Sequence, residues 1–230
     1  MNTFAYDLSE SKLTSIGDEA TDIVQVSEFF EQPGDVLGGA AAHPYAHINT
    51  HYPGVRAVVE PALLEGLCNS VSQLVVKHLG QAERPWMGQA WYSIVTRPAE
   101  TLTPIQRLPH FDEFDETQLA VMIYLNQTAH GGTAFYRHRA TGFEHITQAR
   151  YPEYKTKLEA GVQKTGLPPA AYITDGAPHF EKVYESDAAF NSLILYPGTI
   201  LHSGVIRNDL PLPADPKLGR LTINGFFRPR

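Results

Sequence analysis

The motif at residues 108–112 has the residue types and the spacing of a metal site. It reads Leu-Pro-His-Phe-Asp, so one residue separates His110 from Asp112. In an extended segment, residues i and i+2 project from the same face, so both side chains can reach one ion. An imidazole and a carboxylate are two corners of the facial triad of non-heme Fe(II) sites, which leaves positions open for other ligands. The pair therefore predicts an Fe(II) site with room for a co-substrate and dioxygen.

His202 is the best candidate for the third ligand. It lies in an expected strand at 199–206, directly after a Tyr-Pro-Gly turn at 196–198. An isolated His-x-Asp pair is weak evidence, and a histidine on a strand after such a turn makes the pattern more specific. A jelly roll brings distant strands together, so the long separation in sequence is compatible with one site. We predict that His110, Asp112 and His202 bind the same ion.

Arg220 is the candidate cation for the distal carboxylate of a 2-oxo acid co-substrate. The planar guanidinium group can bind a carboxylate at two points. Residues 208–219 contain three prolines and a glycine, which predicts an exposed loop. If this loop closes a hairpin, the strand that begins at Arg220 runs antiparallel to the strand of His202. Arg220 is then expected near the metal.

Two further residues belong to this prediction. Thr222 lies two positions beyond Arg220, on the same face of the expected strand, and its hydroxyl is a candidate donor to the same carboxylate. Arg207 also follows His202 closely and is the alternative cation. The sequence leaves the choice between Arg220 and Arg207 open.

Short segments rich in β-branched and aromatic residues predict the strands that hold these side chains. Turn signals such as Gly131-Gly132 and Pro197-Gly198 separate them. Many short strands with Gly and Pro turns are typical of a sandwich or barrel. We expect a mainly β chain with flanking helices, folded as a cupin-like jelly roll (double-stranded β-helix). The expected strands are 88–96, 118–126, 133–138, 190–196, 199–206 and 220–227.

Residues 61–79 are the clearest helix. Leucine and valine recur there at spacings of three and four, which makes one apolar stripe. Pro61 suits the first helical position and Gly80 suits a C-terminal cap. We expect this helix to pack on the outside of a sheet. The other N-terminal expectations are a strand within 21–30, a turn at 32–34 and loop structure at 43–55.

The length suits one domain over residues 1–230. Within it we expect strands and a helix at 1–87 that pack on the barrel, and a jelly-roll core at 88–228. Residues 140–180 are expected as an inserted loop with a short helix at 152–161. Such an insertion is either a lid over a site or surface decoration.

Charge, apolar stretches and cysteine content limit the partners and the location that we expect for the chain. The net charge is −7 and there is no run of Lys or Arg, so we expect no nucleic-acid binding. No apolar stretch is long enough to predict a membrane span. The lone cysteine, Cys68, cannot form an internal disulfide and fits a buried thiol in a cytoplasmic protein. A homodimer is left open.

The order of these motifs resembles the Fe(II)/2-oxoglutarate-dependent dioxygenase superfamily. The His-x-Asp pair is followed by Tyr124-Leu125-Asn126 and by the turn Gly131-Gly132-Thr133. Tyr-Pro-Gly-x-x-x-His then ends at His202, and Gly-Arg-x-Thr spans 219–222. The pattern is most similar to the prolyl-4-hydroxylase-like branch, including bacterial members with a Pro-His-Phe-Asp motif. The resemblance covers roughly residues 88–228.

The resemblance implies an oxidoreductase with Fe(II) as cofactor and 2-oxoglutarate as co-substrate. It implies that dioxygen is consumed and that a small molecule or peptide is hydroxylated. Tyr124 is a candidate donor to the co-substrate carboxylate, with a core tyrosine as the alternative. The competing function is a non-catalytic, cupin-like metal-binding or structural protein, and a weaker one is a metal-dependent isomerase or a dioxygenase without a keto acid. The Arg220-x-Thr222 pattern favours the oxygenase.

Overall fold

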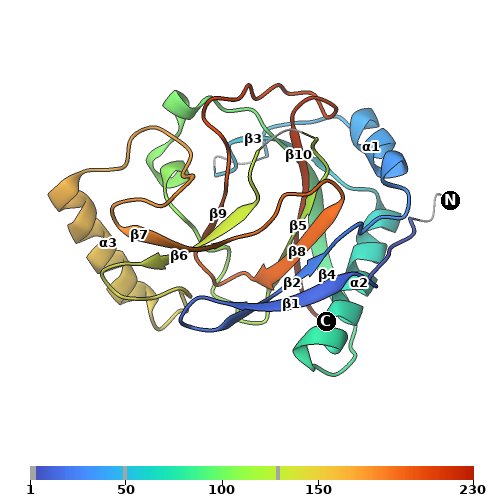
Figure 1. Ribbon diagram of the computed structural model, residues 1–230, viewed down its shortest axis with the longest axis horizontal. Coiled ribbons are helices and arrows are strands. Elements are labelled where there is room, and N and C mark those ends of the chain that lie inside the picture. Colours follow the sequence, from blue (N-terminus) through green and yellow to red (C-terminus); the bar gives the residue numbers. More distant parts are fainter. Residues whose placement is uncertain (1–3, 49–50, 128–129) are drawn as a thin grey trace.

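Two antiparallel sheets form the centre of the computed structural model, which describes residues 4–48, 51–127 and 130–230 (Figure 1). The large sheet has the strand order β1-β2-β8-β5-β10-β4-β3, and the small sheet has the order β7-β6-β9. The large-sheet strands are β1 (Ser11–Ile16), β2 (Thr21–Val26), β3 (Gly54–Val58), β4 (Trp86–Val95), β5 (Leu119–Tyr124), β8 (Ser192–Pro197) and β10 (Arg220–Pro229). The small-sheet strands are β6 (Thr133–His138), β7 (Phe180–Glu185) and β9 (His202–Gly204). The helices are α1 (Pro33–Ala42), α2 (Pro61–Leu79), η1 (Ala99–Thr101), η2 (Pro104–Arg107) and α3 (Tyr151–Thr165).

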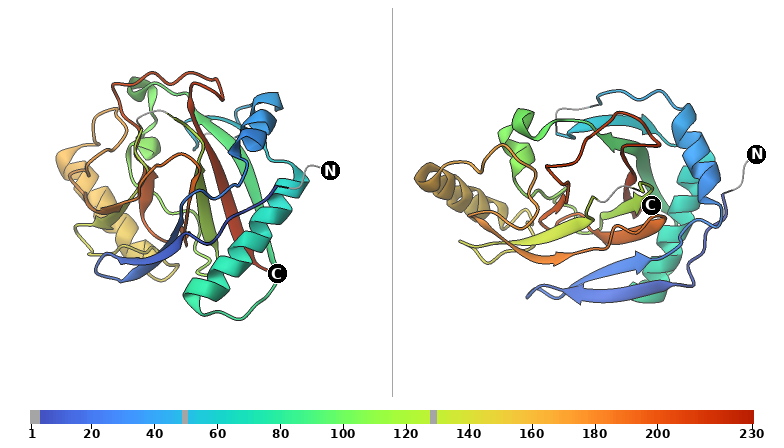
Figure 2. Two further views of the ribbon diagram at one scale, coloured as in Figure 1. Left: turned by 45° about the vertical axis from the view of Figure 1, so that its right-hand side comes forward. Right: turned by 45° about the horizontal axis from the view of Figure 1, so that its top comes forward.

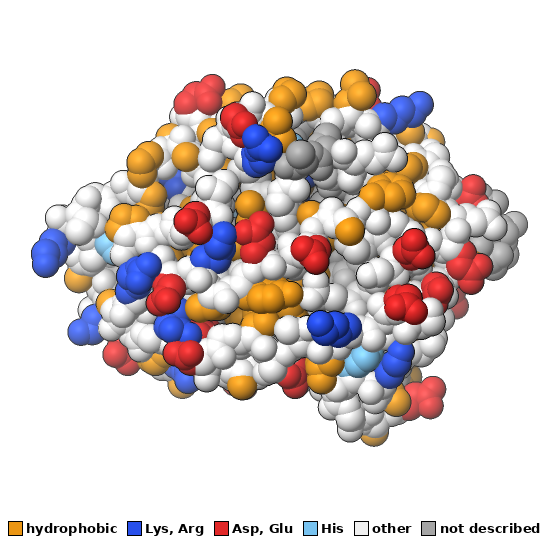
Figure 3. Space-filling model, in the orientation of Figure 1, with side chains coloured by type: hydrophobic (Ala, Val, Ile, Leu, Met, Phe, Trp, Pro, Cys, Tyr) orange, Lys and Arg blue, Asp and Glu red, His pale blue; other side chains and the backbone are white. Residues whose placement is uncertain are grey.

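The arrangement confirms the predicted mainly β jelly roll with flanking helices. The two sheets lie face to face, and α2 and α3 lie at opposite sides of the molecule (Figure 2). Acidic and basic side chains are interspersed over the face drawn in Figure 3. Within the described residues, no helix is long and apolar enough to cross a membrane.

Helix α2 covers the outer face of the large sheet. It begins at Pro61 and ends before Gly80, which has a positive φ of 63° that suits glycine. Its buried stripe packs against the outward-facing side chains of the sheet, including Tyr92 and Ile94. The main apolar core is therefore on this side. The opposite face of the sheet carries a smaller apolar cluster that includes Ala120 and Met122, together with polar residues such as Arg220.

Replacing Leu67 of α2 with alanine is expected to lower the free energy of unfolding by about 2–5 kcal/mol. Leu67 is fully buried in that core, and the truncation leaves a cavity. Val76 on the same helix is 42% exposed, so Val76→Ala is the matched control and should change stability little. Denaturant titration followed by circular dichroism measures both, and equal effects would contradict the assignment of this core.

The insertion contains a longer helix than the sequence predicts. Helix α3 spans Tyr151–Thr165, where a short helix at 152–161 is expected. The start of the insertion is fixed by Glu144, whose carboxylate is fully buried and accepts hydrogen bonds from Arg137 and from the backbone N–H of Asp18. The turn between β1 and β2 therefore holds the base of the insertion.

Three local expectations differ from the structure. The turn expected at 32–34 is the start of α1, and the end of the loop expected at 43–55 belongs to β3. The hairpin expected between the strands of His202 and Arg220 is wrong. Strand β9 pairs with β6 in the small sheet, whereas β10 lies between β5 and β4 in the large sheet. Arg220 therefore approaches the site from the opposite sheet.

Candidate metal centre

Backbone hydrogen bonds bring the His-x-Asp segment to the strand of His202. The N–H of His110 donates to the carbonyl of His202 at 2.9 Å, and the N–H of His202 donates back at 2.7 Å. The N–H of Asp112 donates to the carbonyl of Gly198 at 2.7 Å. The segment at 110–112 is thus extended and paired with the chain around β9, so the three side chains are positioned by the main chain.

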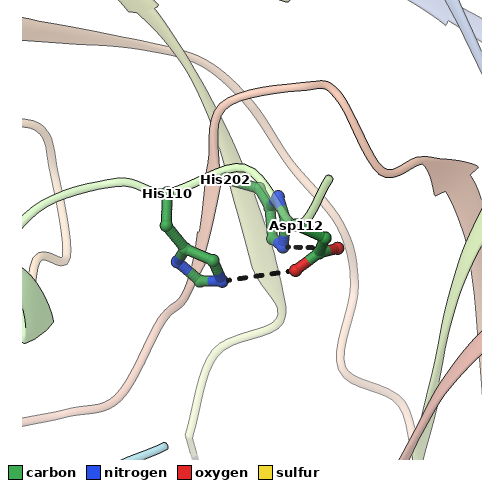
Figure 4. Close-up of side chains that lie close together, drawn as sticks. All are labelled: His110, Asp112 and His202. Atoms are coloured by element: carbon green, nitrogen blue, oxygen red, sulfur yellow. Dashed lines mark ion pairs between the residues drawn. The ribbon is translucent and has the colours of Figure 1, made fainter. Parts of the chain in front are cut away.

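The three side chains converge on one point (Figure 4). The Nε2 atom of His110 lies 3.8 Å from Oδ1 of Asp112, and Nε2 of His202 lies 3.6 Å from Oδ2. One ligand atom from each of the three residues lies within 4.8 Å of the other two. In the part of the chain that the structure describes, this is the only group of three such residues. The arrangement has the two nitrogens and one carboxylate of a facial triad.

Both imidazoles are kept neutral. Burial lowers the pKa of His202 to about 4. Desolvation and the neighbouring His202 also lower the pKa of His110, although 52% of its side chain is exposed. The Nδ1–H of His202 donates to the carbonyl of Ile200 at 2.9 Å, which leaves the Nε2 lone pair facing Asp112. A neutral imidazole held in this tautomer by a backbone carbonyl is the usual form of a metal-binding histidine.

Asp112 has the burial and the unpartnered oxygen expected of a metal ligand. Its side chain is only 10% exposed, and Oδ2 is buried without a hydrogen-bond partner. Burial raises the pKa of Asp112 to about 6, although the neighbouring His110 and Arg56 act in the opposite direction. A buried carboxylate with an orphaned oxygen is unfavourable by itself, and a cation between it and the imidazoles would remove that penalty.

A cavity of about 640 Å³ opens beside these residues. Its wall includes Tyr151, Tyr154 and Leu158 from α3, so the insertion lies over the site. The large sheet contributes Met122, Asn224 and Phe226 from the face opposite α2. The volume suits a co-substrate together with a small organic molecule or the end of a chain.

Arg220 lines this cavity from the large sheet. It is 3% exposed, and its Nη2 donates to the carbonyls of Gly131 and Gly132 at 3.2 and 3.4 Å. Its Nε is buried without a partner, and no carboxylate among the described residues lies within ion-pair distance. Arg207 instead forms an exposed ion pair with Asp209 and does not line this cavity.

Tyr124 and Thr222 lie near the cavity but do not line it. The hydroxyl of Tyr124 is hydrogen-bonded with Thr133 at 2.8 Å and Ser186 at 3.0 Å. The hydroxyl of Thr222 donates to Oδ1 of Asn224 at 2.7 Å. Both hydroxyls are therefore already engaged in the protein.

The sequence reasoning missed Arg56. This arginine lies in β3, lines the cavity, and packs against the rings of Tyr52 and Trp91. The segment was expected to be loop up to residue 55, so no sheet face was assigned to it. The alternation Val55-Arg56-Ala57 was the available signal, because an arginine between apolar residues of a short strand projects from the face opposite theirs.

Solved structures of other proteins share this fold. Structural alignment with HygX from Streptomyces hygroscopicus, solved with nickel, 2-oxoglutarate and hygromycin B bound, gives a TM-score of 0.50 at 9% identity, and covers 92% of this chain and 84% of that one. A Pseudomonas putida prolyl-4-hydroxylase aligns with a TM-score of 0.46 at 13% identity over 92% and 95% of the two chains. At such identity the likeness to HygX shows the fold alone. No curated protein matches the sequence, whereas the model of one protein family, a family of unknown function (DUF6445), matches residues 9–227.

Proposed function

We propose that this chain, which belongs to the family of unknown function DUF6445, is an Fe(II)- and 2-oxoglutarate-dependent oxygenase. The convergence of His110, Asp112 and His202 on one point of the cavity carries the proposal. The bound nickel and 2-oxoglutarate in HygX, which shares the fold, agree with it. On the order of the sequence motifs, we assign the chain to the prolyl-4-hydroxylase-like branch and propose a small-molecule or peptidyl substrate.

The residues fit an Fe(II) ion. Two imidazoles place Nε2 beside the Asp112 carboxylate, and the hydrogen bond of His202 Nδ1–H leaves the Nε2 lone pair of that residue available. Oδ2 of Asp112 is buried without a hydrogen-bond partner. Nitrogen and carboxylate donors with open positions suit non-heme Fe(II). When bound, this ion supplies the activation of dioxygen that is coupled to oxidative decarboxylation of the 2-oxo acid.

The protein's own groups orient the co-substrate and exclude water. The Nε of Arg220 has no partner in the protein, and we propose that it binds the distal carboxylate of 2-oxoglutarate. Arg220 is buried on the large sheet, whereas His202 lies on the small sheet, so the keto acid would bridge the two. Tyr151 and Tyr154 of α3 line this space, and we propose that they limit the access of bulk water to the ionic groups inside it.

Addition of Fe(II) and 2-oxoglutarate under anaerobic conditions is expected to give the weak visible charge-transfer band of a chelated 2-oxo acid. Fe(II) with succinate is the control and should give no such band, because succinate lacks the keto group. Admission of dioxygen should then bleach the band and release succinate. Iron bound without a band would leave the non-catalytic metal-binding protein as the better description.

A further inference from the structure

Arg56 extends into the same cavity from another strand. It lies opposite Ser93 of β4, and Ser93 lies opposite Thr222 of β10. Residues opposite one another in a sheet share a face, so Arg56 projects from the face that also carries Arg220. The two arginine-bearing strands are separated by β4, and their backbones are therefore about 9–10 Å apart.

The guanidinium of Arg56 is held in place by aromatic rings and forms no ion pair with a described carboxylate, although the more distant Asp112 acts on it. Its Cζ lies 4.0 Å from the centre of the Tyr52 ring and 5.5 Å from that of Trp91. Its Nε is buried without a hydrogen-bond partner, and no described carboxylate lies within ion-pair distance. Burial lowers the pKa of Arg56 because the charged form loses solvent. Contact with aromatic rings offsets only part of this cost.

The charges around the cavity leave one arginine uncompensated. Asp112 is the single acidic residue among the described residues that line it, and Arg56 and Arg220 are the two permanent cations. With Fe(II) and 2-oxoglutarate bound, the two charges of the ion and the two of the co-substrate cancel. Asp112 then balances one arginine, and the other retains its charge beside the cavity.

Because β4 separates the two arginines, we expect them to bind two different ligands. Arg220 is nearly fully buried and adjacent to the Gly131-Gly132 turn, whereas Arg56 lies on the edge strand of the large sheet, on the far side of β4. Apolar side chains line much of the same cavity, including Ile105, Met122 and Leu158. A molecule that fills this space meets an apolar surface and one unpaired cation.

We propose that Arg56 binds a carboxylate of the organic substrate, and that this substrate is therefore an acid with an apolar body. The inference rests on the proposed function, since the charge balance assumes that Fe(II) and 2-oxoglutarate occupy the site. A charge-assisted contact of this kind discriminates strongly between an acid and its uncharged amide.

The test compares 4-phenylbutanoate with 4-phenylbutanamide, two probes that differ only in the charge of the acid group. Each is titrated by calorimetry or ligand-observed NMR into protein loaded with Ni(II) and 2-oxoglutarate, because nickel prevents turnover. We expect the acid to bind wild type at least about tenfold more tightly than the amide. Arg56→Gln should reduce this ratio to about one, and Arg56→Lys should keep part of it. Arg207→Gln, at an exposed arginine outside the cavity, should leave it unchanged.

The outcomes separate this inference from the proposed function. Equal binding of acid and amide to wild type, or no binding of the acid at about 10 mM, overturns the role of Arg56. If the ratio of acid to amide affinity is unchanged in Arg56→Gln, the role of Arg56 in binding the acid is also overturned. Arg56 would then serve only to pack against Tyr52 and Trp91. Failure of wild type to take up Ni(II) and 2-oxoglutarate instead overturns the proposed function, and is measured in the same samples before the probes are added.

Discussion

The Asp112→Asn variant is expected to lose Fe(II) binding and 2-oxoglutarate turnover while it keeps its fold. Asparagine has the shape of aspartate but lacks the negative charge that balances the ion. Loss of outer-shell partners of metal ligands already weakens metal binding roughly 10–100-fold, so loss of a direct ligand should weaken it more. Metal titration and succinate release measure the two effects. Asp209→Asn, at an exposed ion pair, is the control.

The stability of the metal-free protein distinguishes this result from misfolding. Burial raises the pKa of Asp112 to about 6 in the folded state, above its ordinary value of 3.8. The ionised carboxylate therefore destabilises the apo protein above that pH, and Asp112→Asn should unfold at the same temperature as wild type or higher. The gain is at most about 3 kcal/mol at neutral pH. It should vanish below a pH of about 4, where the carboxyl is protonated in both states. A clear loss of stability would contradict this description of Asp112.

Replacing Arg220 with glutamine should weaken 2-oxoglutarate binding by roughly 100-fold and leave Fe(II) binding intact. The guanidinium is buried, and its Nε has no partner in the protein. A charge-assisted contact is worth about 1.5–3 kcal/mol, and every 1.4 kcal/mol changes affinity tenfold. Titration of the charge-transfer band measures the affinity.

Two further variants test the choice of cation. Arg220→Lys keeps the charge but not the planar fork, so its affinity should be intermediate. Arg207→Gln should bind 2-oxoglutarate like wild type, because Arg207 is paired with Asp209 outside the cavity. If Arg207→Gln weakens the keto acid and Arg220→Gln does not, the assignment of the two arginines is reversed.

The sequence predicted correctly those helices and strands whose first or last residues are marked by proline, glycine or turn motifs. Helix α2 spans the predicted residues 61–79, because Pro61, Gly80 and a continuous apolar stripe mark both ends and the buried face. Strand β6 also spans the predicted residues 133–138, after the Gly131-Gly132 turn. Helix α1 was missed because its sequence, PGDVLGGAAA, contains three glycines that are poor helix formers. Its formation depends on packing, with Val36 and Ala40 in the core.

Contacts between distant segments limited the prediction of the site. The spacing of His110 and Asp112 is local, so their convergence follows from an extended backbone. The strand of His202 is shorter than the expected 199–206. Residues 200–201 pair instead with the insertion, where the N–H of Leu201 donates to the carbonyl of Glu144. The sequence also did not show which sheet each strand joins. The expected hairpin placed Arg220 in the same sheet as His202, whereas Arg220 lines the cavity from the other sheet. Arg56 comes from an edge strand whose pairing with β4 has no local sequence signal.

A crystal structure grown anaerobically with Fe(II) and N-oxalylglycine, a stable analogue of 2-oxoglutarate, tests the central claim most directly. The account predicts one iron ion bonded to Nε2 of His110, to the carboxylate of Asp112 and to Nε2 of His202, with the distal carboxylate of the analogue on Arg220. Iron bound elsewhere, or an analogue whose carboxylate lies away from Arg220, would contradict it.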